Sequence, residues 1–412
     1  MSTPGPVVGC RLGSLDLLPP RVPAACRTQI WERSRLEWRC HEGGDPLRLL
    51  CEFLSSHGVP VGDLSTSPRV IDSSVCGAAV LLSPPSVKAS PTTTVPALVA
   101  VVYEHGPRRA PDADGPARPV PGPWRGSLPG SGTGSLPGSW TGSWTDAQHA
   151  RAVEEVRAAI ARGDVYVVNL VGHASAPFAG DPRAALARVA ALPGARYGGV
   201  LRGDGWWVAS ASPETLVEVS GGRAVTRPIK GTRPATAEGR AELLASAKER
   251  AEHVMIVDLE RNDLGRVARV GSVRVDELFA IRRWSGLWQA ESTVSARLAG
   301  GVGLAELLRA VWPGGSVTGA PKLAAIEVAT RLEPVGRGPS MGAFGWIGHG
   351  PGGALTVDLG LTIRTVAIAG GRAHVWAGGG IVWDSDPQAE VAEAAAKAAP
   401  VKAALSGGRG EA

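Results

Sequence analysis

The chain has 412 residues, of which 44% are hydrophobic, so it can bury a sizeable core in two or three domains or in one large mixed unit. Its formal net charge of +5 is spread thinly, and no run of lysine and arginine is interleaved with aromatic residues, which argues against a nucleic-acid-binding groove. The strongest apolar run, "VPALVAVVY", is far shorter than the roughly 18 residues that a membrane-spanning helix needs.

Cysteine usage argues against both a disulfide framework and a zinc cluster, because the number is odd and no C-x-x-C pair occurs. All of the cysteines fall in the first fifth of the chain: Cys10, Cys26, Cys40, Cys51 and Cys76. This pattern favours a reducing compartment. Because the first residues also lack a basic start followed by a long apolar segment, we expect a soluble, cytoplasmic protein.

The first part of the chain, residues 1–103, contains strand-like runs such as "AAVLLS" and "ALVAVVY" but no recognisable group of chemically active residues. Residues 104–145 are so rich in glycine, proline and serine that they cannot bury enough surface to offset their ordering entropy. We interpret this segment as a linker or mobile loop. Its "GSGTGS" neither follows a strand nor opens a helix, so it is not a nucleotide-binding loop.

From residue 146 onward the pattern sharpens. Asp146 can cap a helix that ends at Gly163, and further helices are expected over 236–256, 303–311, 321–332 and 387–404. Strands with alternating residues lie between them, including "DVYVVNLVGHASA" and "LTVDLGLTIRTVAIAGGRAHVWAGGG". Since strands and helices come in clusters separated by glycine turns, we predict an α+β fold with antiparallel sheets.

Two of these helices each carry a pair of glutamates spaced three residues apart, hence on one helix face: Glu249 with Glu252, and Glu390 with Glu393. If the two faces meet, they could hold a magnesium ion, which prefers oxygen ligands and keeps waters for a charged substrate. Two ordinary solvated helix faces would show the same spacing, so spacing alone leaves both interpretations open.

Several other positions could bind a small anion. The loop "GGSVTGA" opens a helix at Pro321, where free amide groups bind anions, and Arg364 could grip a carboxylate with two hydrogen bonds. Three consecutive glycines, Gly378–Gly380, follow a strand at a point where only backbone can line a ligand. In "RPIKGTRP", Lys230 stands in a tight turn that can aim its side chain. Each feature could be purely structural; together they describe a pocket for a small di-acid beside a metal.

Seven segments carry a specific pattern: "SASPETL", "RPIKGTRP", "KERAEHVMIVDLERNDLGRV", "PGGSVTGAPK", "GAFGWIG", "TIRT" and "AGGGIVWDSDPQAE". In order and spacing they resemble the chorismate-utilising enzymes, the family of anthranilate, aminodeoxychorismate, isochorismate and salicylate synthases. The resemblance covers about residues 146–404 and is faint over 1–103. It implies that 146–412 is the catalytic domain, that 1–103 is the amino-terminal part of the synthase, and that the fold consists of two large antiparallel sheets flanked by helices.

The resemblance also implies roles for single residues. Glu252 and Glu393 would be Mg²⁺ ligands, with Glu249 and Glu390 holding the waters of the metal. Glu214, in "SPE", would be the general acid for the departing ring hydroxyl. The residues that would contact the carboxylates of chorismate, or lie close to them, are Thr318, Arg364, Gly378, Gly379, Gly380 and Lys397.

Three positions bear on the branch of the family. Aminodeoxychorismate synthases read P-I-K-G-T, as this chain does, and Lys230 would then add to carbon 2 of chorismate. Anthranilate synthases have alanine there and a histidine where this chain has Gln289, while isochorismate and salicylate synthases have a lysine where it has Val167. We therefore expect a magnesium-dependent transferase that makes 4-amino-4-deoxychorismate, the precursor of p-aminobenzoate, for either folate biosynthesis or a specialised-metabolite pathway. Anthranilate synthase component I and a non-catalytic chorismate-binding protein remain alternatives, the latter because the preferred branch usually has glutamine at the position of Val167.

No glutaminase is recognisable in the chain, since no cysteine lies in a G-x-C-x-G nucleophile turn. The resemblance implies a separate glutamine amidotransferase subunit that supplies ammonia. Free ammonia should substitute weakly for it.

Overall fold

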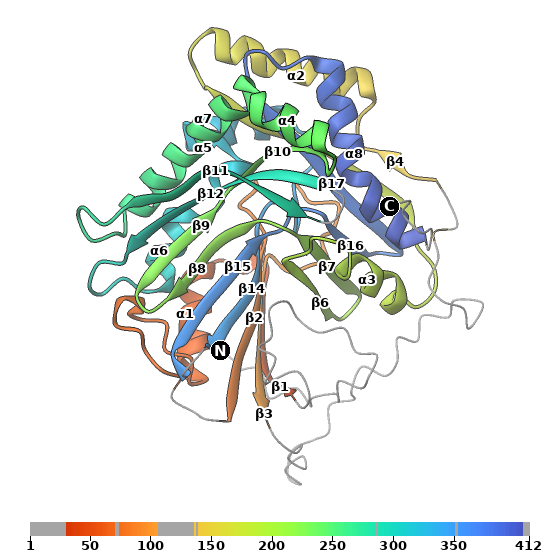
Figure 1. Cartoon of the computed structure of the whole chain (residues 1–412). Coiled ribbons are helices and arrows are strands. Elements are labelled where there is room, and N and C mark those ends of the chain that lie inside the picture. Colours follow the sequence, from red (N-terminus) through yellow and green to blue (C-terminus); the bar gives the residue numbers. More distant parts are fainter. Residues whose placement is uncertain are drawn as a thin grey trace.

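The structure is a computed structural model and describes residues 30–70, 74–105, 136, 139–284, 287–350 and 353–406. Two β-sheets, of ten and seven principal strands, form its centre, and every strand pair in them is antiparallel. Helices lie on the outside of both sheets (Figure 1). The predicted α+β fold with two large antiparallel sheets is confirmed.

The ten-stranded sheet combines strands from both ends of the chain. In spatial order its strands are β1 (Ile30–Trp38), β3 (Leu98–His105), β2 (Val75–Leu82), β14 (Ala343–His349), β15 (Leu355–Leu361), β8 (Thr215–Ser220), β9 (Arg223–Arg227), β12 (Leu287–Arg297) and β10 (Ile229–Pro234), with β11 (Arg274–Trp284) also paired to β12. Because β2 pairs directly with β14, residues before and after the 104–145 segment share one sheet. Residues 106–135, the greater part of the predicted linker, lie outside the described residues.

The seven-stranded sheet is built from residues after 140. Its order is β13 (Gly319–Ala320), β5 (Val167–Pro177), β17 (Arg372–Ile381), β16 (Thr365–Ala369), β7 (Trp206–Ser212) and β6 (Tyr197–Gly203), with β4 (Thr141–Gly142) also paired to β5. The triple glycine belongs to β17, where Gly378 is opposite Val171 and Gly380 is opposite Asn169 of β5.

Eight α-helices and three 3₁₀ turns lie within the described part of the chain. They are α1 (Pro46–Ser56), α2 (Asp146–Ala161), α3 (Arg183–Ala190), α4 (Ala237–Ala245), α5 (Ala247–Gly265), α6 (Leu304–Val311), α7 (Lys322–Leu332), α8 (Pro387–Ser406), η2 (Cys40–Glu42), η3 (Leu64–Thr66) and η4 (Gly315–Val317). Helix α5 packs on β10, β11 and β12, whereas α3 and α8 pack on the seven-stranded sheet and α7 packs on β5. None of these helices is long and apolar enough to cross a membrane.

Two helix predictions need correction. The cap of α2 is Thr145, whose side chain accepts from the Gln148 amide, and Asp146 is the first helical residue. The helix expected over 236–256 is two helices, because Ser246 has ψ 106° and breaks the helical backbone before α5 continues to Gly265. The Ser246 side chain caps the second helix at the Glu249 amide.

The cysteine prediction is also wrong at one position. Cys76, in β2, is disulfide-bonded, whereas Cys40 and Cys51 are free. An odd number of cysteines excludes the pairing of all of them but not of two. The cysteine count alone therefore does not indicate a reducing compartment.

The main hydrophobic core lies along the ten-stranded sheet. All eight residues of β2 are buried, and Phe344 and Trp346 of the neighbouring β14 are 0% and 1% exposed. Two smaller buried clusters involve the helices: one lies beneath α3 and α8, and the other lies beneath α2 and α7. This packing holds both sheets in place on either side of the candidate site.

Candidate active site

Lys230 lies on β10, where the strand is bulged between Lys230 and Thr232. Gly231 makes this bulge possible, because its φ of +73° lies in the left-handed region that favours glycine. The Lys230 Nζ donates to the Ser316 carbonyl at 3.3 Å, and a Cβ at Gly380 would lie 3.4 Å from that nitrogen. The amine therefore points from the ten-stranded sheet toward the glycines of β17 in the other sheet.

Glu214 lies between β7 and β8 and is 5% exposed. Its Oε1 accepts from the Ile229 amide at 3.4 Å, next to Lys230 in the chain. Burial raises the pKa of Glu214, and a hydrogen bond from the Ser316 side chain and the charge of Lys230 only partly oppose this. One residue, Ser316, thus contacts both Glu214 and Lys230, so the predicted acid and the predicted nucleophile meet at one loop.

The second pair of glutamates reaches the same place from α8. Asp386 caps this helix, since its side chain accepts from the Ala389 amide at 2.8 Å. A Cβ at Gly379 would lie 3.0 Å from Glu390 Oε2 and 3.7 Å from Glu393 Oε1. Any side chain at this position would therefore press on the Glu390 carboxylate.

Lys397 follows one turn later on α8. Its Nζ donates to the Gly378 carbonyl at 2.9 Å and pairs with Glu393 Oε1 at 2.7 Å. The lysine therefore ties the helix to the glycine strand.

The first pair of glutamates faces the site from α5. Glu249 Oε1 accepts from Arg233 at 3.3 Å, and a Cβ at Gly231 would lie 3.0 Å from its other oxygen. Lys248 Nζ lies 3.9 Å from Glu252 Oε1 and 4.0 Å from Glu390 Oε1, so one cation already bridges α5 and α8.

The position of Lys248 indicates whether a cation can be bound between the glutamates of α5 and α8. A cationic nitrogen stands between carboxylates of both helices, and carboxylate oxygens are the ligands that magnesium prefers. Within the described residues no three acidic, histidine or cysteine side chains are gathered closely enough to form a complete metal site. An ion at this place would therefore need water or substrate for several of its ligands.

The pKa values of these glutamates reflect burial and crowding. Burial raises the pKa of Glu252 to about 7, with Glu249 and Glu390 adding repulsion against the attraction of Lys230. Burial also raises the pKa of Glu390. At Glu393, burial acts to raise the pKa, but the pairing with Lys397 outweighs it and the pKa is lowered. A bound divalent cation would relieve the repulsion in this cluster.

Arg364 and Thr318 complete the predicted set. Arg364 has φ +49°, and burial lowers the pKa of its guanidinium while the charge of Glu214 opposes this. Among the residues that the structure describes, none accepts a hydrogen bond from this guanidinium, so it is available to an anionic ligand. Thr318 is 2% exposed, and its hydroxyl donates to the Gly314 carbonyl at 2.9 Å within the same loop.

Of the other two positions that bear on the branch, Val167 lies close to Lys230. A Cβ at Gly380 would lie 3.5 Å from Val167 Cγ2, almost as close as to the lysine nitrogen. Gln289 is opposite Thr232 in the sheet, is 2% exposed, and its Oε1 has no partner within the described chain.

Sequence reasoning missed the residues that hold the predicted ones in place. Ser316 is the clearest case, because its contacts to Lys230 and Glu214 join positions far apart in the chain. Arg337 donates to the Val317 carbonyl at 2.6 Å and pairs with the buried Glu333, which fixes the next residue of the same loop. The small residues of "GGSVTG" were a signal for a tight loop but not for these partners.

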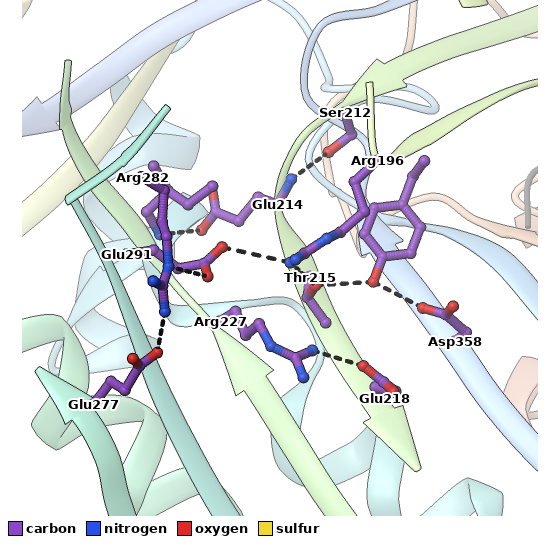
Figure 2. Close-up of polar contacts among 12 residues, drawn as sticks. Arg196, Ser212, Glu214, Thr215, Glu218, Arg227, Glu277, Arg282, Glu291 and Asp358 are labelled. Atoms are coloured by element: carbon purple, nitrogen blue, oxygen red, sulfur yellow. Dashed lines mark hydrogen bonds and ion pairs between the residues drawn. The ribbon is translucent and has the colours of Figure 1, made fainter. Parts of the chain in front are cut away.

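A further polar cluster begins at Thr215, directly after Glu214 (Figure 2). Thr215 accepts from Arg196 at 3.0 Å, and Arg196 pairs with the buried Glu291 at 3.4 Å. Arg282 is paired with Glu277 and lies 3.9 Å from Glu291. Since both arginines are paired with carboxylates, this cluster ties strands together beside the site and offers little unpaired charge.

The structure thus brings together a lysine, a buried glutamate, a buried arginine and two glutamate pairs, of which the pair on α8 faces the glycine strand. These are features of an enzyme that acts on a small anionic substrate.

Comparison with known proteins gives the same class. A family model described as chorismate binding enzyme matches residues 125–403. The chain is 39% identical over 268 residues to aminodeoxychorismate synthase component 1 of Bacillus subtilis (strain 168), covering 64% of this chain and 56% of that protein. It is 42% identical over 256 residues to anthranilate synthase component 1 of Streptomyces coelicolor, covering 60% and 49%. The chain thus spans about half the length of these curated relatives.

Among solved structures, anthranilate synthase component I from Streptococcus pneumoniae TIGR4 has the same fold, with a TM-score of 0.70 at 24% identity over 97% of this chain and 100% of that one. The chain belongs to the chorismate binding enzyme family.

Proposed function

We propose that the protein is the synthase component of an aminodeoxychorismate synthase, a magnesium-dependent transferase that replaces the 4-hydroxyl of chorismate with an amino group. The observation that carries the proposal is the position of Lys230, whose Nζ is held by the Ser316 carbonyl and faces Gly380. The 39% identity to the Bacillus subtilis aminodeoxychorismate synthase component 1 supports the same branch.

In this proposal Lys230 is the nucleophile. Its neutral amine adds to carbon 2 of chorismate, the ring double bond shifts, and the 4-hydroxyl departs as water with a proton from Glu214. Ammonia then adds at carbon 4, the double bond shifts back, and the lysine leaves carbon 2. The sum is chorismate plus ammonia giving 4-amino-4-deoxychorismate plus water. Covalent catalysis divides one difficult displacement into two easier ones.

Glu214 suits the role of acid because burial raises its pKa and extends the protonated form toward neutral pH. Its place beside Ser316 also lets it exchange protons close to Lys230. Arg364 and the backbone of Gly378–Gly380 would hold the carboxylates of the substrate. Lys397 would hold the glycine strand in place through Gly378, and Thr318 would hold the loop next to it.

Magnesium would be held by Glu252 and Glu393, with Glu249 and Glu390 binding its waters. When bound, the ion would neutralise a substrate carboxylate and the crowded glutamates. Lys248, which now lies between Glu252 and Glu390, would move aside.

Ammonia would come from a separate glutamine amidotransferase subunit. The "component 1" in the name of the Bacillus subtilis relative is in keeping with a second component. Free ammonium would replace the partner at lower efficiency.

Anthranilate synthase is the second candidate, because the Streptomyces coelicolor relative is 42% identical. Loss of pyruvate in that reaction requires a histidine where this chain has Gln289. The lysine and the missing histidine together favour amination at carbon 4.

Incubation of the protein with chorismate, Mg²⁺ and ammonium, followed by chromatography and mass spectrometry, tests the proposal. We expect aminodeoxychorismate without anthranilate. Anthranilate as the product would make the second candidate correct. Magnesium-dependent binding of chorismate by calorimetry, with no product at saturating ammonium, would indicate a non-catalytic binding protein.

A further inference from the structure

Glu260 is a buried carboxylate to which the proposed reaction gives no role. It is 3% exposed and lies on α5, eight residues after Glu252. It also lies 11 residues after Glu249, about three turns at 3.6 residues per turn, so these two side chains share one helix face. The face of α5 that carries Glu249 therefore continues with Glu260.

The two oxygens of Glu260 bind two different segments. Oε2 accepts from the Thr226 hydroxyl at 3.1 Å, and Oε1 accepts from the Gly315 amide at 3.2 Å. Thr226 is 2% exposed, and a Cβ at Gly315 would lie 3.0 Å from the same Oε1. A single side chain thus clamps the end of β9 to the η4 turn.

Both segments are linked directly to Lys230, one through the chain and the other through a hydrogen bond. Thr226, in β9, precedes the lysine by four residues, and only two residues separate it from the start of β10. Gly315 precedes Ser316, whose carbonyl accepts from the lysine nitrogen and whose side chain contacts Glu214.

A neighbouring ion pair fixes the far end of the same loop. Asp263, one turn after Glu260, is 4% exposed and binds Lys322 at 2.6 Å. Lys322 is the first residue of α7, which follows η4 and β13. Helix α5 therefore anchors both ends of the loop that touches the lysine.

We propose that Glu260 is a positioning residue for Lys230, which it aims by joining β9 to the Ser316 turn. This inference rests on the proposed role of Lys230 as the reacting amine. Glu260 itself does not touch the substrate.

The clamp does not depend on the charge of Glu260. Burial raises its pKa to about 7; Asp263 and Glu214 raise it further, while Lys322 and Thr226 lower it. The protonated acid can still accept from the Gly315 amide and can donate to the Thr226 hydroxyl, since a hydroxyl both donates and accepts. A glutamine would make the same two hydrogen bonds, whereas a leucine of similar size would make neither.

The test compares Glu260→Leu, Glu260→Gln and Thr226→Val with the wild-type protein. With chorismate, Mg²⁺ and ammonium, we expect Glu260→Leu to lower kcat about ten- to a hundredfold, because small misplacements of a reacting group cost that much. The KM for chorismate should stay close to the wild-type value, because Arg364 and the glycine strand bind it. Glu260→Gln should keep kcat within about twofold, and Thr226→Val, which loses one of the two links, should lie between.

A second readout does not depend on turnover. The rate at which a small amine-selective acylating reagent modifies Lys230, followed by peptide mass spectrometry, should rise in Glu260→Leu and Thr226→Val but not in Glu260→Gln. Lys397, held by Glu393 and Gly378, serves as the internal control in each sample.

Unchanged labelling of Lys230 in Glu260→Leu would overturn the inference, as would labelling of Glu260→Gln that matches Glu260→Leu. If Glu260→Leu does not fold, unchanged labelling in Thr226→Val overturns it equally. If the wild-type protein makes no aminated product, the proposed function fails, and the labelling rates still decide whether Glu260 holds Lys230.

Discussion

At the scale of single residues, the site depends on backbone that comes unusually close to side chains. Gly379 brings β17 to Glu390, and Gly380 brings it to Lys230. Ser385 donates to Glu390 Oε1 at 2.6 Å and holds the carboxylate in this place. A Cβ at Gly379 would press on Glu390, whereas a Cβ at Gly380 would make ordinary van der Waals contacts.

Replacement of Gly379 tests this geometry. In Gly379→Ala the new Cβ would lie 3.0 Å from Glu390 Oε2, so the carboxylate has to move. We expect the affinity for Mg²⁺, measured by calorimetry, to fall about tenfold, as is usual when a group beside a metal ligand is disturbed. Gly300→Ala, where no atom lies within 4 Å, is the control and should bind normally. Equal affinities in both variants would mean that Glu390 is not part of the metal site.

The residues to which we assign chemical roles stand out in the sequence more clearly than the residues that contact them. Lys230 and Glu214 stand in recognisable motifs, so the sequence predicts them without a structure. Ser316 and Glu260 act through contacts to residues dozens of positions away. Such contacts exist only after the sheets have formed, and no local pattern encodes them.

At the scale of elements, β10 and α5 together aim Lys230. The bulge at Gly231 turns the lysine toward β17, while a Cβ at Gly231 would lie 2.7 Å from Leu243 Cδ1 of α4. The break at Ser246 separates α4 from α5. The prediction of a single helix over 236–256 overlooked Ser246 and Glu249, whose S-x-x-E spacing is a signal for a new helix start.

A comparison of alanine variants at two glycines with the same φ can separate the effect of backbone strain from an effect on the reaction. Gly231 has φ +73° and Gly205 has φ +72°, but no atom lies within 4 Å of a Cβ at Gly205. Alanine at either place costs about 1–2 kcal/mol of backbone strain. We expect only Gly231→Ala to lower the amination rate, by about tenfold or more, because only it shifts the strand that carries Lys230. If Gly205→Ala lowers the amination rate by a similar factor, the loss in Gly231→Ala is due to general destabilisation of the protein.

Binding of magnesium between α5 and α8 can be measured through the melting temperature, without an activity assay. Magnesium bound by both helices should raise the melting temperature, since a ligand at a hundred times its Kd stabilises the folded state by about 2.7 kcal/mol. Glu252→Gln should lose most of this rise, and its melting temperature without magnesium should not fall, because burial disfavours the charged form of this side chain. Glu155→Gln, an exposed change on α2, should respond as the wild type does. If magnesium raises the melting temperature of Glu252→Gln as much as that of the wild type, Glu252 is not a metal ligand.

At the scale of the whole molecule, strands from the first hundred residues complete the sheet that carries Lys230. The pairing of β2 with β14 joins positions more than 250 residues apart, so sequence patterns predict the strands but not their partners. The fold class followed from the clustering of strands and helices and from the family resemblance. The order of strands required the structure.

A buried histidine pair makes the stability of the molecule pH-dependent. His173 Nε2 lies 3.1 Å from His374 Nδ1, and burial lowers the pKa of each to about 4. In the unfolded chain both titrate near about 6.5, so between these values the unfolded state binds more protons. The stabilisation is therefore fully present above about pH 6.5 and is lost as the pH falls toward 4.

Urea unfolding of the wild-type protein and of His374→Gln at several pH values tests this. We expect the wild type to lose more free energy of unfolding between pH 6.5 and 4 than the variant, because the variant has one fewer buried group to protonate. His41→Gln, on the surface, should follow the wild type. Parallel pH curves for wild type and His374→Gln would show that the pair does not contribute.

The central claim is that the amine of Lys230 reacts with the substrate. The most direct measurement is the rate at which wild type and Lys230→Ala form aminodeoxychorismate from chorismate with Mg²⁺ and ammonium, each checked by calorimetry for chorismate binding. We predict that the variant still binds chorismate but loses most of the activity of the wild type. Aminodeoxychorismate formed by Lys230→Ala at the wild-type rate would contradict the account.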